Sequence, residues 1–317
     1  MWGTIRDGSC AFWRFTRLTY QEGEKKYSMD RWTGIVKVSL RNDNRDVFFK
    51  VAISLLLRPS SKSLAVPSAN AIFFNGDQVK GTGNPVIERL SDLKNIAEIL
   101  ASKLGASFNI WVFESSTFNG PFAIYKEFVP SVNSRGEPKY YDPHGFPASS
   151  CMVEILKKII NQVNIASLSG LHESSWLTST KSAMSSHVLR LFYEAENGIC
   201  PSFLGSFLLS ISQIHYVDVG LNCCGAYLTD EFVIKEVAKL LMSHNSSLRF
   251  VLHGTPRQWY DTDRPWICRE KDALLQALRV AKHKCEGRLQ VVERLYFTDM
   301  KPSLQMHFGI IESMDVS

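Results

Sequence analysis

The sequence lacks the features that mark several classes of protein. Its longest apolar run, residues 47–57, is interrupted by Lys50 and falls short of the roughly 18 residues that a membrane-spanning helix needs. Its seven cysteines form neither a C-x-x-C pair nor a zinc-binding spacing. We therefore expect reduced thiols, and neither a membrane span, a bound metal nor a cofactor.

The chain also lacks a large excess of charge of one sign. The 36 basic and 31 acidic residues leave a formal net charge of +5, and the basic residues are scattered along the chain. Nucleic-acid binding requires a clustered basic face, so this pattern argues against it. Hydrophobic residues make up 45% of the 317 residues and charged residues 21%, which is enough apolar material for the core of one large domain.

Residues 1–28 differ in character from the rest of the chain. They are rich in arginine and aromatic residues, but they also contain acids such as Glu22 and Glu24, whereas transit peptides are poor in acids. A leader and an alternative N-terminus both remain open. We expect the folded unit to be one domain over residues 29–317, with an atypical segment over residues 164–210.

The remainder of the chain predicts an α/β fold. Alternating apolar residues predict strands over residues 32–40 and 46–57, joined by polar turn residues into an antiparallel hairpin that opens the sheet. Further on, short apolar segments that fit buried parallel strands alternate with helical patterns, which implies a mostly parallel sheet with helices on both faces. The expected strands are residues 71–74, 108–113, 211–217, 248–252 and 289–297, and the expected helices are residues 90–104, 152–163, 230–242 and 269–284.

Candidate site residues follow the parallel strands, because ligands bind at the carboxyl ends of the strands in such sheets. Gly76, Asp77 and Gln78 follow the first parallel strand, where the hydrolase fold supplies backbone N–H groups to an oxyanion hole. A plain tight turn is the alternative interpretation of this segment.

A carboxylate and a histidine follow the last two strands. Asp261 lies in the loop after residues 248–252, and His307 lies beyond the final strand. This order is that of α/β hydrolases, in which the carboxylate orients the imidazole that takes the nucleophile's proton. We predict that Asp261 and His307 meet at the carboxyl edge of the sheet, with Asp218 as the second-choice acid and His253 as the second-choice base. A surface or capping role is the alternative for each of these residues.

Several longer motifs are similar to those of one known family. They are His-Gly-Thr-Pro-Arg-Gln at residues 253–258 with Asp261, Arg264 and Trp266, Phe-Phe-Asn-Gly-Asp at 73–77, Ile-Ala-Glu-Ile-Leu at 96–100, Tyr-Phe-Thr at 296–298, Lys-Pro-Ser at 301–303 and His-Phe at 307–308. With these motifs, residues 29–163 and 211–312 resemble the family of the human chromosome 2 open reading frame 69 protein and its plant relatives. The resemblance implies an α/β-hydrolase-like fold and residence inside the cell, in mitochondria or cytoplasm. It does not imply a substrate.

The nucleophile elbow of that family, G-x-S-x-G, is missing from residues 163–211, where the resemblance would place it. The nearest mimic is Gly-Ile-Cys-Pro-Ser at residues 198–202, in which Cys200 would be the nucleophile. Pro201 opposes this role, because the residue after the nucleophile must donate a backbone N–H to the oxyanion and proline has none. We therefore predict no serine-hydrolase turnover.

Three interpretations of the chain remain open. It is a serine-type ester or lipid hydrolase that uses the acid and the histidine, a non-catalytic relative that binds a small acyl or lipid-like ligand or a partner, or a splice or gene-model variant in which residues 164–210 replace the elbow. The elbow strand would lie between residues 71–74 and 211–217, which are too apolar to remain open edges. We expect these two strands to pair directly, or residues 188–193 or 203–209 to fill the position between them.

Overall fold

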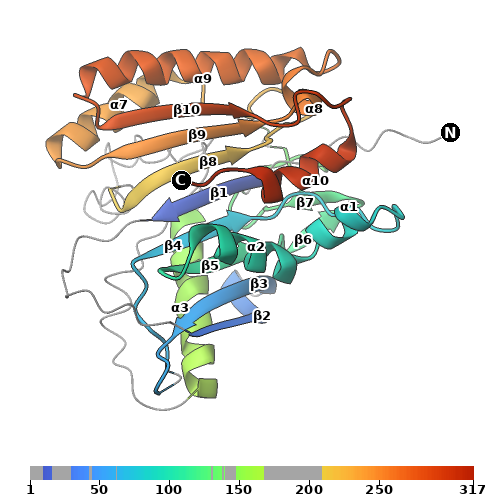
Figure 1. The fold of residues 1–317 in the computed structure, drawn as a ribbon, viewed down its shortest axis with the longest axis vertical. Coiled ribbons are helices and arrows are strands. Elements are labelled where there is room, and N and C mark those ends of the chain that lie inside the picture. The colour runs from blue at the N-terminus through green and yellow to red at the C-terminus, as the bar shows by residue number, and fades with distance from the viewer. Residues whose placement is uncertain are drawn as a thin grey trace.

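The fold is built around an eight-stranded sheet, in which the strands follow the order β10-β9-β8-β1-β4-β5-β3-β2 (Figure 1). A computed structural model describes residues 10–15, 30–42, 45–61, 63–129, 131–137, 139, 148–167 and 209–317. The strands of this sheet are β1 Cys10–Phe15, β2 Asp30–Asn42, β3 Arg45–Leu57, β4 Ala69–Phe74, β5 Phe108–Phe113, β8 Ile211–Val217, β9 Leu248–Gly254 and β10 Leu289–Leu295. A small second sheet consists of β6 Thr117–Asn119 and β7 Phe122–Ile124.

The large sheet contains two parallel blocks. β8, β9 and β10 pair in parallel, as do β4 and β5. The antiparallel hairpin of β2 and β3 adds to β5 at one end of the sheet, which confirms the predicted hairpin. The predicted alternation of strands and helices is confirmed as well. The sheet as a whole is mixed rather than mostly parallel, because β1 runs antiparallel between the two blocks.

The N-terminal strand β1 lies in the middle of the sheet. Ala11 pairs with Phe74 of β4, and Cys10 pairs with Val217 of β8. This corrects two expectations, namely that the folded unit begins near residue 29 and that β4 pairs directly with β8. Both neighbours of β1 are largely buried strands that cannot remain open edges, so β1 supplies partners for their backbone groups. We expected residues 188–193 or 203–209 to fill this position, and of these only residue 209 lies within the described residues.

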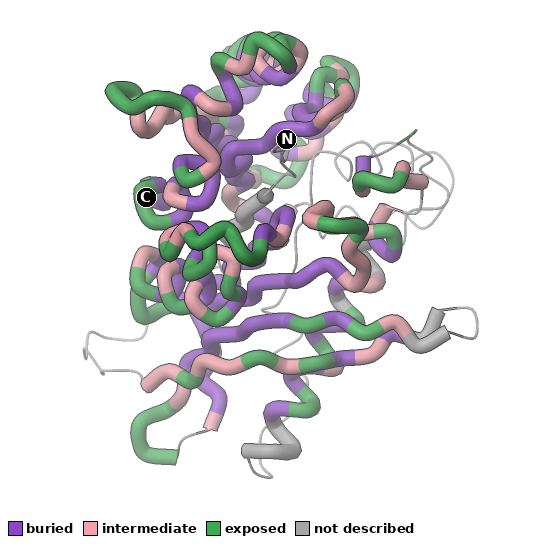
Figure 2. The backbone as a smooth tube through the Cα atoms, turned by 90° about the vertical axis from the view of Figure 1, so that its right-hand side faces the viewer, coloured by how far each residue is buried: buried purple, intermediate pink, exposed green. Residues whose placement is uncertain are grey.

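Burial explains why the central segments form strands. All six residues of β5 are buried, and Ile72 and Phe73 of β4 are 0% exposed. Apart from Asn109, whose side chain accepts a hydrogen bond from the amide of Leu56 at 2.9 Å, β5 is apolar throughout, which fits a strand that is covered on both faces. β2, at the edge of the sheet, instead mixes exposed residues such as Ile35 with buried ones such as Val38 (Figure 2).

The helices are α1 Pro85–Leu90, α2 Leu93–Leu104, α3 Ala148–Ser167, α7 Glu231–Ser243, α8 Pro256–Trp259, α9 Pro265–Lys284 and α10 Leu304–Ser313. α2 packs on β5 and β3, α3 on β2, and α9 on β10. The side chain of Asp92 caps α2 by accepting a hydrogen bond from the amide of Asn95 at 2.9 Å. Gly105 ends the helix with a φ of 82°, a conformation that favours glycine, as the sequence predicts. Within the described ranges, no helix combines the length and the apolar character needed to cross a bilayer.

Candidate active site

Asp218 and His307 form a buried carboxylate–imidazole pair. Nδ1 of His307 lies 3.0 Å from Oδ2 of Asp218, and the two side chains are 5% and 0% exposed. Because an ionised carboxylate only accepts hydrogen bonds, Nδ1 carries the proton, and the lone pair of the neutral ring is on Nε2. An imidazole oriented in this way can take a proton from a nucleophile or from water.

The loops after β8 and β9 fix the carboxylate. Asp218 follows β8 directly with a φ of 47°, which is uncommon for a residue other than glycine, and its amide donates to the carbonyl oxygen of His253 at 2.7 Å. Oδ1 accepts a hydrogen bond from the amide of Thr255 at 2.7 Å, and Oδ2 accepts one from the Thr255 hydroxyl at 3.1 Å. With the bond from His307, these contacts hold the carboxylate in one orientation. Backbone strain of this kind is concentrated at functional sites.

Helix α10 presents the histidine. His307 lies in its first turns, between the buried side chains of Met306 and Phe308. The ring of Phe308 stands edge-on to the imidazole, with 5.4 Å between the ring centroids. Phe297, with a φ of 59°, lies in the segment that leads from β10 to this helix. The apolar packing of α10 therefore holds the imidazole against the carboxyl edge of β8.

The contact with His307 is made by Asp218, the second-choice acid, and this corrects the predicted pairing of Asp261 with His307. Oδ2 of Asp261 instead accepts a hydrogen bond from Nε of Arg264 at 2.8 Å, and its Oδ1 accepts one from the amide of Asp263 at 2.8 Å. Burial alone would raise the pKa of Asp261, but these hydrogen bonds outweigh it and hold the pKa below its ordinary value. Asp261 therefore pairs with Arg264, which lies three residues further along the chain, and not with His307.

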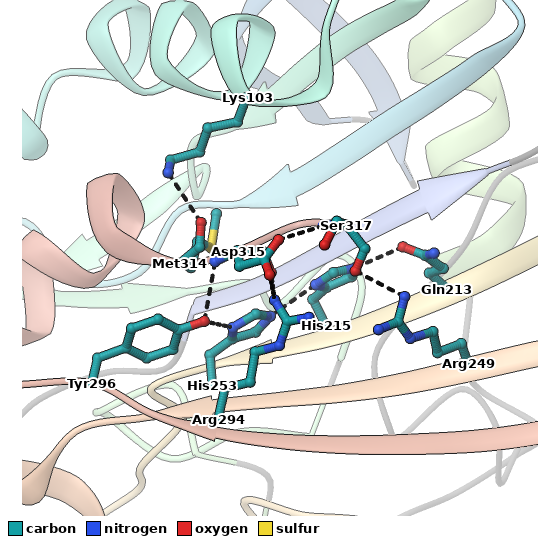
Figure 3. A network of polar contacts seen from close by, with 10 residues as sticks. All are labelled: Lys103, Gln213, His215, Arg249, His253, Arg294, Tyr296, Met314, Asp315 and Ser317. Carbon is teal, nitrogen blue, oxygen red and sulfur yellow. Dashed lines mark hydrogen bonds and ion pairs between the residues drawn. The ribbon is translucent and has the colours of Figure 1, made fainter.

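His253, the second-choice base, belongs to a separate buried network (Figure 3). Nε2 of His215 lies 3.1 Å from Oε1 of Gln213, which only accepts, so this nitrogen donates. Nδ1 of His215 then accepts from Nε2 of His253 at 2.9 Å, and Nδ1 of His253 accepts from the Tyr296 hydroxyl at 3.0 Å. The Tyr296 oxygen accepts in turn from the amide of Asp315 at 3.0 Å. Both ring nitrogens of His253 are therefore occupied, and this residue is not placed to act on a ligand.

The segment predicted to form an oxyanion hole ties the small sheet to the end of β4. The amide of Gln78 donates to the carbonyl oxygen of Pro121 at 2.9 Å, and its side chain donates to Glu114. Oδ1 of Asp77 accepts from the amide of Ala123 at 2.8 Å. The Gln78 amide is therefore committed to a turn contact, whereas an oxyanion role for Gly76 and Asp77 stays a prediction.

Thiols and metal ligands add no second site within the described ranges. The cysteines whose side chains are described, namely Cys151, Cys223, Cys224, Cys268 and Cys285, are free, as expected. Burial, followed by the charge of Glu137, raises the pKa of Cys223 to about 11, so this thiol stays protonated and unreactive near neutral pH. No group of three or more potential metal ligands occurs among the described residues. Cys200 lies outside the described residues.

Comparisons with known proteins give few matches. No protein-family model matches the chain, and no curated protein matches it. Among solved structures, the chain is similar to a crystal structure of a candidate carboxylesterase from Lactobacillus plantarum, with 12% identity and a TM-score of 0.39. The similarity covers 84% of this chain and 88% of that chain.

The sequence pattern missed two contributors to the site. Thr255 belongs to the motif at residues 253–258, but only the structure shows that it donates hydrogen bonds to Asp218 from both its amide and its hydroxyl. α10 was not predicted, although Met306, Phe308, Ile310 and Ile311 give residues 304–313 a recognisable helical spacing.

Proposed function

We propose that the chain is an α/β-hydrolase-like protein that binds a small acyl ligand at the Asp218–His307 pair and does not turn it over with a serine nucleophile. The observation that carries the proposal is the buried hydrogen bond between these two side chains. It supplies the acid and histidine corners of a hydrolase triad at the carboxyl ends of parallel strands. The family resemblance of the sequence supports the same fold, and residence in mitochondria or cytoplasm is proposed from that resemblance alone.

The orientation of β1 supports the absence of turnover. In α/β hydrolases the nucleophile elbow follows a parallel strand in the sheet and turns into a helix. Here the strand between β4 and β8 is antiparallel, so its N-terminal end, at Cys10, reaches the edge where Asp218 lies. A strand of this orientation cannot be followed by an elbow at that edge, and the G-x-S-x-G motif is missing from residues 163–211.

An active ester or lipid hydrolase is the second candidate. The observation that favours it is that Thr255 and His307 fix the Asp218 carboxylate, so that the carboxylate in turn fixes the tautomer in which the imidazole can accept a proton. Some catalysis also survives the loss of one triad member, through binding and oxyanion stabilisation.

Fluorophosphonate labelling and calorimetry separate the two candidates. We expect no labelling of the purified chain, no hydrolysis of short or long acyl esters above that of a His307→Asn variant, and measurable binding of a short acyl ester that His307→Asn weakens. His283→Asn, which changes an exposed histidine on α9, should leave binding unchanged. Stoichiometric labelling of a serine, or ester hydrolysis that both His307→Asn and Asp218→Asn abolish, would establish the active hydrolase instead.

A further inference from the structure

Arg264 is a buried cation that the motif at residues 253–266 holds in place. Its side chain is only 2% exposed. Nε donates to Oδ2 of Asp261 at 2.8 Å, and Nη2 donates to Oε1 of Gln258 at 2.9 Å. Nη1 is buried and has no hydrogen-bond partner. Because each terminal nitrogen of a guanidinium carries two N–H groups, two donors of this charged side chain lack an acceptor.

An unpaired charged donor of this kind requires an explanation. A buried donor without a partner costs about 1–3 kcal/mol, and more when the group is charged. Native proteins leave few such groups, and a catalytic role, an ordered water or a bound ion is the usual reason. The guanidinium is planar and rigid, so the contacts with Asp261 and Gln258 also fix the direction of Nη1. Arg264 is therefore a preorganised donor for an acceptor that the chain itself does not supply.

This donor lies on the same edge of the sheet as the candidate active site. The side chain of Gln258 lies so close to Gly220 that an added Cβ there would collide with it, and Gly220 follows Asp218 by two positions. Arg264 is also the N-cap residue of the twenty-residue helix α9, whose N-terminus has no side-chain cap. The N-terminus of a helix favours negative charge, which adds to the attraction for an anion.

We propose that Arg264 binds a carboxylate of the ligand, so that the acyl ligand carries a second, negatively charged end. This inference rests on the proposed function, because it specifies the ligand of the same site. A carboxylate fits better than a phosphate dianion, because Asp261 already balances the charge of Arg264 and leaves no positive charge to offset a second negative charge on the ligand. Nη1 offers hydrogen bonds to such a monoanion, and the second charge of a dianion would add only further repulsion from Asp261.

Two esters of similar size test this specificity. Monomethyl succinate carries a carboxylate and methyl butyrate does not, and binding of each is measured by calorimetry and thermal unfolding. We expect the wild-type chain to bind monomethyl succinate at least tenfold more tightly than methyl butyrate, and more tightly than inorganic phosphate. Arg264→Gln should remove this preference, whereas Asp261→Asn should strengthen binding, because it removes the carboxylate that competes for the guanidinium. Arg269→Gln, an exposed arginine of α9, is the matched control and should keep the preference.

Each outcome decides between the inference and an alternative. Equal affinity for the two esters, tighter binding of phosphate, or wild-type preference in a folded Arg264→Gln variant overturns the role of Arg264 while the proposed function stands. Binding of neither ester overturns the proposed function and the inference together. If Arg264→Gln does not fold, the wild-type preference and the effect of Asp261→Asn decide, because a purely structural Asp261 would weaken binding or leave it unchanged.

Discussion

His253 should make the stability of this fold depend on pH. Burial, with the positive charge of Arg294 adding to it, lowers the pKa of His253 to about 3, from an ordinary value of 6.5. The unfolded chain takes up a proton as the pH falls through 6.5, whereas the folded chain does so only near pH 3. The stability that comes from the neutral ring is therefore fully present above pH 6.5 and is lost progressively as the pH falls toward 3.

The size of the effect follows from the two pKa values. At about pH 4.5, two units below the unfolded value, proton uptake by the unfolded chain lowers the free energy of unfolding by about 2.7 kcal/mol. This is a large share of the ~5–15 kcal/mol that stabilises a typical domain. Burial explains most of this cost, because a charged ring inside the fold loses the solvation that it has in the unfolded chain, and the positive charge of Arg294 adds repulsion.

Urea unfolding at several pH values between about 7.5 and 4.5 measures this effect. The wild-type chain should lose on the order of 3 kcal/mol more stability over this range than a His253→Gln variant, which has no titrating ring. His283→Gln, at an exposed position, should follow the wild-type curve. The same pH slope in the wild-type chain and in His253→Gln would refute the reasoning, since the buried ring would then contribute nothing to the pH dependence.

Three further predictions concern the sheet and the site. Deletion of residues 1–15 should expose the edges of β4 and β8 and increase hydrogen exchange of their amides, while the amides of β9 stay protected. Unchanged protection of β4 and β8 would mean that another segment fills the position between them. Thr255→Val, which removes a hydroxyl from Asp218, should lower the free energy of unfolding by about 1–2 kcal/mol in urea, and an unchanged midpoint would count against a buried hydrogen bond there. Gly254→Ala should cost about 3 kcal/mol or prevent folding, because its Cβ would overlap the Trp259 ring. Gly309→Ala, whose Cβ would lie 3.6 Å from the nearest side chain, should be neutral or stabilising. Equal thermal stability of the two variants would contradict the packing of α8.

Local patterns predicted the strands and helices well because each of these elements satisfies its own periodicity. The mostly apolar segment of β5 and the helical spacing of α2 with Gly105 at its end needed no long-range information. β1 could not be predicted in this way. Its position depends on the need of β4 and β8 for a hydrogen-bonded strand between them, which is a property of the assembled sheet.

The acid of the candidate site shows the same limit. Sequence order places both Asp218 and Asp261 after late strands, and it does not distinguish them. Which carboxylate contacts His307 depends on which one already has another partner. Arg264 forms an ion pair with Asp261, three residues before it in the chain. Asp218 is held by Thr255, 37 residues further along the chain, and this contact forms only when β8 and β9 lie side by side.

The pairing of Asp218 with His307 is tested most directly by nitrogen-15 NMR of the histidine side chains, which reports the tautomer of each ring. We predict that His307 carries its proton on Nδ1 in the wild-type chain, that Asp218→Asn changes this tautomer or breaks the hydrogen bond, and that Asp261→Asn leaves both unchanged. A His307 ring that is protonated on Nε2 in the wild-type chain, or one that responds to Asp261→Asn and not to Asp218→Asn, would contradict the account.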